Sequence, residues 1–387
     1  MARFTQLFLA SAALALTATP SAADQSAPDT VTLSPDELLA PYYARLRQST
    51  VLPNAGEGPS LSPAQTLTRV AFGSCNHQSA SQHMWDEVLS ADPQLFLMLG
   101  DNVYGDSAWD GDAALESLRV SYEEQAAHPE WQRLRKGVPM LATWDDHDYG
   151  LNDKGASFPM RRWAEAMFEE FWGSSDAVRA RDGIYDSVTV GPQGQRVQII
   201  LLDTRFFRSD LKRMPWSNER PPLGVYVPDT DPAATVLGPE QWRWLEAELA
   251  KPADLRIVAS SIQIITEAHN FESWENFPLE RTRLFDALAS REESGLVLLS
   301  GDRHSGGVYK TEHQGEEFWE ITSSSLNRAY WRSAEENSQR EPDPSRVSLF
   351  YNVENYGMVD FDWAEREVTV TLKDRASETL TAHAYAW

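Results

Sequence analysis

The chain has 387 residues, of which 42% are hydrophobic, and it contains 14 tryptophans, which fits a folded protein with a sizeable core rather than a disordered chain. Its formal net charge of −24 opposes nonspecific binding to nucleic acids and adhesion to anionic membranes. The same charge would repel a phosphate ester unless local cations reversed its sign, so the composition already points to bound metal.

Residues 1–23 are predicted to be a secretory signal peptide. One early cation, Arg3, precedes an apolar run from Leu7 to Leu16, and Ser21-x-Ala23 suits signal peptidase. The run is too short to span a bilayer, and no comparable run follows. Because the chain lacks an Arg-Arg pair near its start, the general secretory route is favoured over twin-arginine export. We expect a periplasmic or extracellular protein with no membrane span.

Residues 24–65 are predicted to form an N-terminal arm. This segment is rich in Pro, Ser and Ala and contains one helical pattern, at 34–48. It is too short to bury a core of its own, so we expect it to pack on the domain that follows, residues 66–387.

Strand and helix patterns alternate from residue 66 onward, and only strand patterns remain near the end of the chain. Alternation of this kind predicts an α/β fold with layered, largely parallel sheets covered by helices, to which the final strands add antiparallel edges. Strands are predicted at 66–75, 93–101, 138–146, 196–204, 255–263, 295–304, 316–324, 356–363 and 367–374, and helices at 81–91, 113–128, 161–173, 239–250 and 280–290.

The segment from Met214 to Thr235 is rich in proline and has no clear periodicity. It is predicted to be a long surface loop, and loops of this length are often functional, so it is a candidate lid. A second loop, "FESWENFP", contains Trp274, which we interpret as a packing residue.

Six apolar runs end in polar clusters. Ligands in open α/β sheets gather beyond the carboxyl ends of the strands, so these clusters are expected to converge. They are Gly73–Asn76, Gly100–Tyr104, Asp145–Asp148, Asp203–Arg205, Ser260–Gln263 and Gly301–His304.

The side chains in these clusters are of types that bind metals. Carboxylates packed together would repel one another and stay partly protonated unless a multivalent cation were bound. A thiolate and a phenolate joined to carboxylate and imidazole suit Fe3+, and a neighbouring oxygen-rich pocket suits Ca2+ or another hard divalent ion. The candidate ligands are Cys75, Asp101, Tyr104, Asp146, Asp302 and His304.

The motifs "FGSCN", "GDNVYGD", "WDDHDYGLND", "LLDTR" and "SGDRHSGG" closely resemble those of the PhoD-like alkaline phosphatases, a branch of the calcineurin-like metallophosphoesterases. The resemblance extends over about residues 66–375. It implies two packed mixed sheets between two layers of helices, with iron and calcium at the strand ends. It also implies that Fe3+ is held by Cys75, Asp101, Tyr104 and His304, and that Asp101 bridges to a divalent site completed by Asp146 and Asp302.

The resemblance also implies roles for the "DDHD" segment. His147 would protonate the leaving oxygen, and Asp148 would orient His147. The alternative is that His147 binds a metal or hydrogen-bonds to a metal ligand.

Three further assignments concern residues near the strand ends. Arg205 either pairs with Asp203 or holds a phosphate oxygen through its guanidinium. Gln263 is predicted to complete the divalent site by its amide oxygen, and Asn152 and Asp153 are candidates for a second calcium.

These features together predict a secreted metal-dependent phosphoric ester hydrolase, an alkaline phosphatase or phosphodiesterase. Metal-bound hydroxide would attack phosphorus in line with the leaving alcohol, without a covalent enzyme intermediate. The expected substrate is a small phosphate mono- or diester, and no nucleic-acid-binding surface is expected. The alternatives are a phospholipid- or nucleotide-specific phosphodiesterase on the same scaffold, and a non-catalytic exported protein that binds metal or, through its tryptophans, carbohydrate.

Overall fold

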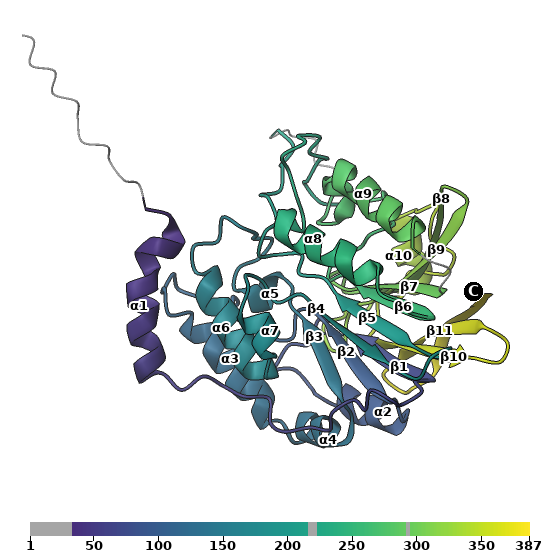
Figure 1. The fold of residues 1–387 in the computed structure, drawn as a ribbon, viewed down its shortest axis with the longest axis horizontal. Helices are drawn as coiled ribbons and strands as arrows, with labels where there is room; N and C mark the ends of the chain where they lie inside the picture. Colours follow the sequence, from purple (N-terminus) through teal and green to yellow (C-terminus); the bar gives the residue numbers. More distant parts are fainter. Residues whose placement is uncertain (1–32, 216–222, 292–294) are drawn as a thin grey trace, which may run out of the picture.

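The computed structural model of the protein describes residues 33–215, 223–291 and 295–387. In these ranges two six-stranded mixed sheets pack face to face, and helices cover both outer faces (Figure 1). The predicted α/β fold of two packed mixed sheets flanked by helices is therefore confirmed. The predicted signal peptide, residues 1–23, and the first part of the predicted arm, residues 24–32, lie outside the described residues.

The first sheet has the strand order β12-β11-β10-β1-β2-β3. Its strands β1, β2 and β3 are parallel, whereas β10, β11 and β12 form an antiparallel meander joined to β1 through β10. The predicted antiparallel edge is therefore present. The strands are β1 (Arg69–Gly73), β2 (Leu95–Leu99), β3 (Met140–Thr143), β10 (Asn355–Asp362), β11 (Glu367–Asp374) and β12 (Thr379–Ala386).

The second sheet has the strand order β4-β5-β6-β7-β9-β8. Strands β5, β6, β7 and β9 are parallel, and an antiparallel strand closes each edge. The strands are β4 (Asp186–Val190), β5 (Val197–Leu201), β6 (Leu255–Ala259), β7 (Gly295–Ser300), β8 (Gly306–His313) and β9 (Glu316–Ser323).

Strand β2 shows how the sandwich is packed. Successive side chains of a strand point to opposite faces of its sheet. Leu97 and its alternate neighbours join the core between the two sheets, whereas Phe96 and Met98 join the core beneath the outer helices. Because both faces are covered, the strand reads as a continuous apolar run rather than an alternating one.

The helices form the two outer layers. Aromatic side chains of α2, α3, α4 and α6 pack on the first sheet, and apolar side chains of α8 and α9 pack on the second. No helix in the described ranges combines the length and apolar character needed to cross a bilayer. The helices are α1 (Pro35–Ser49), α2 (Met84–Ser90), α3 (Glu116–Ala127), α4 (Pro129–Gly137), α5 (Asp146–Tyr149), α6 (Arg161–Trp172), α7 (Asp176–Arg179), α8 (Gly238–Leu249), α9 (Pro278–Ala289) and α10 (Ala334–Arg340), with a short 3-10 helix, η1 (Trp274–Asn276).

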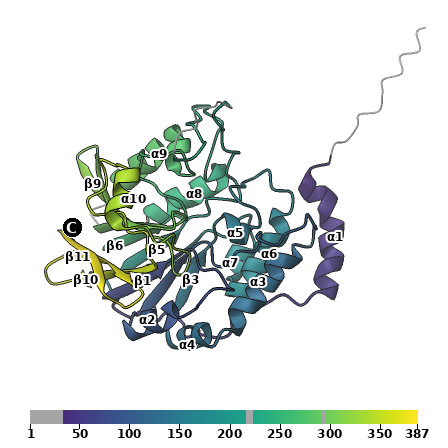
Figure 2. The same ribbon diagram turned by 180° about the vertical axis from the view of Figure 1, so that it is seen from behind.

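Helix α1 lies at the side of the sandwich, next to α6 (Figure 2). Ser34 caps its first turn in a capping box with Glu37, which fixes where the helix begins. The ring of Tyr43 stacks on Trp163 of α6 with the centroids 5.4 Å apart, and Asp36 pairs with Arg161 at 2.8 Å. The helix predicted in the arm is thus anchored by both apolar and ionic contacts.

The proline-rich segment at 214–235 is described only in part, because residues 216–222 lie outside the described ranges. Its described portion is held beside residue 270: the backbone N–H groups of Val225 and Tyr226 both donate to the carbonyl of Asn270, at 2.7 and 2.8 Å. A second anchor is the hydroxyl of Tyr226, which donates to the carboxylate of Asp153 at 2.5 Å.

Candidate metal centre and adjoining cavity

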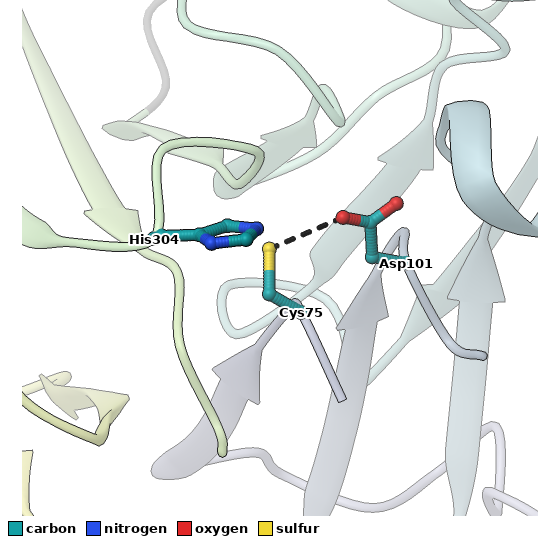
Figure 3. Close-up of side chains that lie close together, drawn as sticks. All are labelled: Cys75, Asp101 and His304. Carbon is teal, nitrogen blue, oxygen red and sulfur yellow. Dashed lines mark hydrogen bonds between the residues drawn. The ribbon is translucent and has the colours of Figure 1, made fainter. Parts of the chain in front are cut away.

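The candidate metal centre lies where strands of both sheets end. Cys75 follows β1, Asp101 follows β2, and His304 follows β7 of the other sheet. Figure 3 shows these three side chains pointing toward one another across the gap between their loops. The expected convergence of distant strand ends on one place is therefore found in the structure.

The first cluster brings together the four side chains predicted to hold iron. The Sγ atom of Cys75 lies 3.3 Å from Oδ2 of Asp101. The hydroxyl of Tyr104 lies 3.1 Å from the same oxygen and 3.0 Å from Nε2 of His304. Thiol, carboxylate, phenol and imidazole thus surround one small volume.

A second cluster extends from Asp101 toward the second sheet. Ligand atoms of Asp101, Asp146 and His147 lie within 4.8 Å of one another, and so do those of Asp145, Asp146 and Asp302. The three predicted divalent ligands therefore lie together, and Asp145 joins them.

Unpartnered atoms in these clusters fit cations. Oδ1 of Asp146, Oδ2 of Asp145 and Nδ1 of His304 are buried and have no hydrogen-bond partner among the described residues. A buried polar atom left without a partner costs free energy, and a buried charge costs more, so buried charges are normally paired or bound to metal. The donor set combines hard oxygens with sulfur and nitrogen, which suits iron beside a hard divalent ion.

The backbone around the ligands is strained. Cys75, Asp101, Asp302 and His304 all have positive φ, between 48° and 69°, a region that residues other than glycine seldom occupy. Each such residue costs of order 1–3 kcal/mol, and this kind of strain gathers at functional sites. Because four candidate ligands have this conformation, the placement of their side chains is maintained at the cost of backbone strain.

Gly100, next to Asp101, is the tightest point of this backbone. It has φ of +99°, and a Cβ atom there would lie 2.5 Å from Cβ of Asp145. We expect Gly100→Ala to lower the free energy of unfolding by more than about 2 kcal/mol, measured by denaturant titration. Gly111→Ala is the matched control, because Gly111 has φ of +97° but no atom within 4 Å of such a Cβ. Equal losses in the two variants would contradict a steric cause.

Burial and mutual repulsion disfavour ionisation of the cluster. Burial and then the Cys75 thiolate raise the pKa of Asp101 well above its ordinary value, and burial raises the pKa of Cys75 to about 11. Burial and the neighbouring Asp145 and Asp146 likewise raise the pKa of Asp302. A bound multivalent cation would reverse these shifts because it stabilises the ionised ligands.

His147 is held by a partner that the sequence analysis did not select. Its Nδ1 lies 2.6 Å from Oδ1 of Asp106, the last residue of "GDNVYGD". Burial disfavours the imidazolium, but the charges of Asp146, Asp101 and Asp106 outweigh it and raise the pKa of His147 to about 11. A nearby cation would oppose that rise.

The contacts of Asp148 do not support its predicted role of orienting His147. Its carboxylate accepts backbone N–H groups of Asp101, Asn102 and Asp145, at 3.2, 3.2 and 2.7 Å. Asp148 therefore joins the turn after β2 to the start of α5. It positions Asp101 rather than the histidine.

Arg205 does not face the substrate side of the site. Its guanidinium is fully buried, donates to Asp145 through Nε at 2.7 Å and pairs with Glu272 at 2.6 Å. The prediction that it binds a phosphate oxygen does not match this geometry, because two carboxylates already occupy its donors. The alternative partner, Asp203, accepts a hydrogen bond from the backbone N–H of Arg205 and not from its guanidinium.

Gln263 also has its amide committed elsewhere. Its Oε1 accepts from Arg303 at 3.0 Å and lies 3.1 Å from Nε2 of His269, and its amide nitrogen donates to Thr322. The prediction that this oxygen completes the divalent site is therefore not supported by the geometry. The amide instead positions Arg303.

A third acidic grouping was only partly foreseen. Ligand atoms of Asp146, Asp153 and Glu272 lie within 4.8 Å of one another. Asp153 is one of the two predicted calcium candidates, whereas Glu272 is not predicted from the sequence because it lies in the loop "FESWENFP" rather than at a strand end. Trp274 of the same loop is fully buried, which agrees with its predicted packing role.

The clusters open into a cavity of about 570 Å³. Asp146, His147, Asp302 and His304 are among the residues that line it. Tyr226 of the partly described loop lines it too. The volume falls in the range of sites for small organic ligands and exceeds what a lone phosphate group needs.

Comparisons with known proteins identify related sequences and a related fold. A family model described as PhoD-like phosphatase matches residues 70–372. Alkaline phosphatase D of Bacillus subtilis (strain 168) is 25% identical over 308 residues, 68% of this chain and 51% of that protein, so the chain spans about half the length of this curated relative. A solved structure of PhoD matches with a TM-score of 0.65 at 18% identity, covering 85% of this chain and 70% of the other, which indicates a shared fold.

Proposed function

Because the chain belongs to the PhoD-like phosphatase family, we propose that it is a metal-dependent hydrolase of phosphoric esters, an alkaline phosphatase or phosphodiesterase. The observation that carries the proposal is the convergence of Cys75, Asp101, Tyr104 and His304 beside a cavity lined by carboxylates and imidazoles. Carboxylate oxygens of Asp145 and Asp146 have no partner among the described residues, although Asp145 also pairs with Arg205, and such buried oxygens suit a bound cation. Small phosphate mono- or diesters are the proposed substrates.

The proposed cofactors are Fe3+ and Ca2+, with other divalent ions as replacements for calcium. Cys75, Tyr104 and His304 would hold the iron, Asp146 and Asp302 the divalent ion, and Asp101 both. When bound, such cations neutralise charge on the phosphate and acidify a coordinated water molecule.

The chain's own residues supply the proton transfer and the positioning. His147 lines the cavity next to Asp146, so its ring is placed to give a proton to the leaving alcohol oxygen. Because Nδ1 of His147 is bonded to Asp106, Nε2 is the ring nitrogen that remains to donate a proton. Asp148 fixes the turn that presents Asp101.

Hydrolysis of two chromogenic esters tests the proposal. The purified protein should release nitrophenol from 4-nitrophenyl phosphate or from its bis ester, and dialysis against a chelator should abolish this activity. Readdition of iron and calcium together should restore it more fully than either alone. Metal-replete protein that cleaves neither ester would refute the proposal, and the faster ester distinguishes phosphatase from phosphodiesterase.

We further propose export and three segments: a signal peptide (1–23), a packed arm (24–65) and a catalytic domain (66–387). Expression of the full chain in a bacterial host tests the cleavage point. The protein recovered from the periplasm or the medium should begin at Asp24 by N-terminal sequencing. Recovery of an uncleaved chain from the cytoplasm alone would contradict this.

A Tyr104→Phe variant should lose visible colour. A phenolate bound to ferric iron absorbs visible light, and the Tyr104 hydroxyl lies beside Asp101 and His304. The matched control is Tyr330→Phe, because the ring of Tyr330 stacks on His304 with centroids 5.2 Å apart but is exposed to solvent. The control should keep the absorption band. Iron-containing Tyr104→Phe protein with an unchanged spectrum would contradict ligation by Tyr104.

A further inference from the structure

Two arginines that line the cavity have charges that no described residue balances. Arg332 and Arg340 both line it, and the side chain of neither forms an ion pair or hydrogen bond with a described residue. In a chain with 58 acidic and 34 basic residues, partners for an arginine are plentiful. Two exposed guanidinium groups at one cavity are therefore available to a ligand that is not part of the chain.

Arg303, in the same cavity, is the contrasting case. It donates to Glu341 at 2.7 Å and to Gln263 at 3.0 Å, and its guanidinium lies 5.0 Å from the ring centre of Phe271. Its charge is balanced inside the protein. Of the arginines that line the cavity, Arg332 and Arg340 are therefore the two whose charge remains available to a ligand.

The backbone that presents the two arginines is tied to the candidate metal centre. The N–H of Arg332 donates to Oδ1 of Asn352 at 3.3 Å, and the amide nitrogen of Asn352 donates to the carbonyl of His304 at 2.7 Å. Arg340 ends α10, and Asn337 of that helix donates to Ser305, the residue after His304, at 3.2 Å. The backbone positions of both arginines are therefore tied to the strand end that carries His304, whereas their side chains are exposed.

An arginine in the last turn of a helix also interacts favourably with the helix dipole, which is a structural explanation for Arg340. That explanation does not extend to Arg332, which precedes α10 and lies outside any helix. The shared feature of the pair is the cavity and not the helix end.

We propose that Arg332 and Arg340 form a second anion subsite, and that the preferred substrate is a phosphate ester whose alcohol carries a further phosphate or carboxylate. This inference rests on the proposed function. One anionic group would lie beside Asp146 and Asp302 and the cations that they would hold. The other would bind to the two arginines. Guanidinium groups suit this task because they bind phosphate and carboxylate oxygens through paired hydrogen bonds. A cavity of about 570 Å³ leaves room for both groups and the linker between them.

Calorimetric binding to the purified full chain with its metals tests the subsite without requiring turnover. Alkanediol bisphosphates of increasing length are compared with alkyl monophosphates of the same length. The wild type should prefer the bisphosphate, most strongly at one length. In the double variant Arg332→Gln/Arg340→Gln, the ratio of bisphosphate to monophosphate affinity should fall about tenfold, the effect of one accessible charge-assisted hydrogen bond. The double variant Arg243→Gln/Arg283→Gln removes two positive charges from exposed arginines of α8 and α9, so it is the charge-matched control and should keep the ratio.

Two results would overturn the subsite: equal affinity of the wild type for both series, or a ratio that survives the double substitution. Lys variants at the two positions should restore part of the preference, which separates lost charge from lost folding. Hydrolysis of the same compounds is measured in parallel. Preferential binding of the bisphosphate without hydrolysis would reject the proposed function and support the subsite. Hydrolysis without a preference for the bisphosphate would support the proposed function and reject the subsite.

Discussion

An Asp101→Asn variant is expected to lose both bound metal and activity. The carboxylate of Asp101 belongs to two acidic groupings, one with Cys75 and His304 and one with Asp146 and His147. The amide keeps the shape of the side chain but removes the charge that two cations would share. Hydrolysis of 4-nitrophenyl phosphate should fall about a thousandfold or more, equivalent to roughly 4 kcal/mol in the barrier. Elemental analysis of the same sample should show less iron.

The same variant should be more stable than the wild type when both are stripped of metal. The raised pKa of Asp101 means that its ionised form is disfavoured in the folded protein. The stability of the metal-free wild type therefore falls as the pH rises above the unfolded carboxyl pKa, and Asn removes this loss. Thermal unfolding at neutral pH measures the effect.

Asp203→Asn is the matched control for Asp101→Asn. Asp203 is equally buried at the end of β5, but it lies in none of the acidic groupings and accepts backbone N–H groups of Arg205 and Phe206. It should keep its metal and lose stability. If Asp101→Asn protein kept full metal content and activity, the assignment of Asp101 as shared ligand would be wrong.

The second large effect is expected for His147→Gln, and it should depend on the leaving group. For alkyl phosphates, whose leaving alkoxide needs a proton, kcat should fall about 10²- to 10⁴-fold. For 4-nitrophenyl phosphate the loss should be much smaller, because nitrophenolate leaves without protonation. Equal losses on both substrates would indicate that His147 binds metal or phosphate and does not act as the proton donor.

Asp106→Asn should show the same dependence on the leaving group with smaller losses, since Asp106 acts through its 2.6 Å contact with Nδ1 of His147. Asp148→Asn provides the comparison, because Asp148 bonds to the backbone of the Asp101 turn. Its substitution should lower thermal stability and metal content, with equal losses on both ester types. An Asp148→Asn variant that reproduced the His147 pattern would restore the original prediction for Asp148.

The fold was largely predictable because most strands are buried on both faces. Continuous apolar runs such as Leu95–Leu99 stand out in a sequence. The three strands that were missed, β4, β8 and β12, all lie at sheet edges. An edge strand buries less apolar surface, and β12, for example, alternates small and polar residues with no buried position. Its pairing with β11 depends on tertiary contacts, which a local sequence pattern does not predict.

The candidate ligands were predictable for a different reason. A carboxylate or thiol directly after an apolar strand has few explanations other than a site at the sheet edge, which is why Cys75, Asp101 and Asp302 could be selected. Arg205, Gln263 and Asp148 also lie near strand ends, yet each bonds to residues remote in sequence. Arg205 pairs with Asp145 and Glu272, for example, 60 and 67 positions away. Those partners determine the direction in which such a side chain points. The spacing of residues in the sequence does not predict that direction.

The connectivity of the first sheet determines when the metal centre can exist. Strand β1, which leads to Cys75, has the late strand β10 as one of its two neighbours, and Tyr104 meets His304 across 200 positions. A chain that emerges from a translocation channel with its N-terminus first would present thiol and phenol long before the imidazole arrives. Cation capture would therefore mark the end of maturation, and metal content would report the fraction of molecules that completed it.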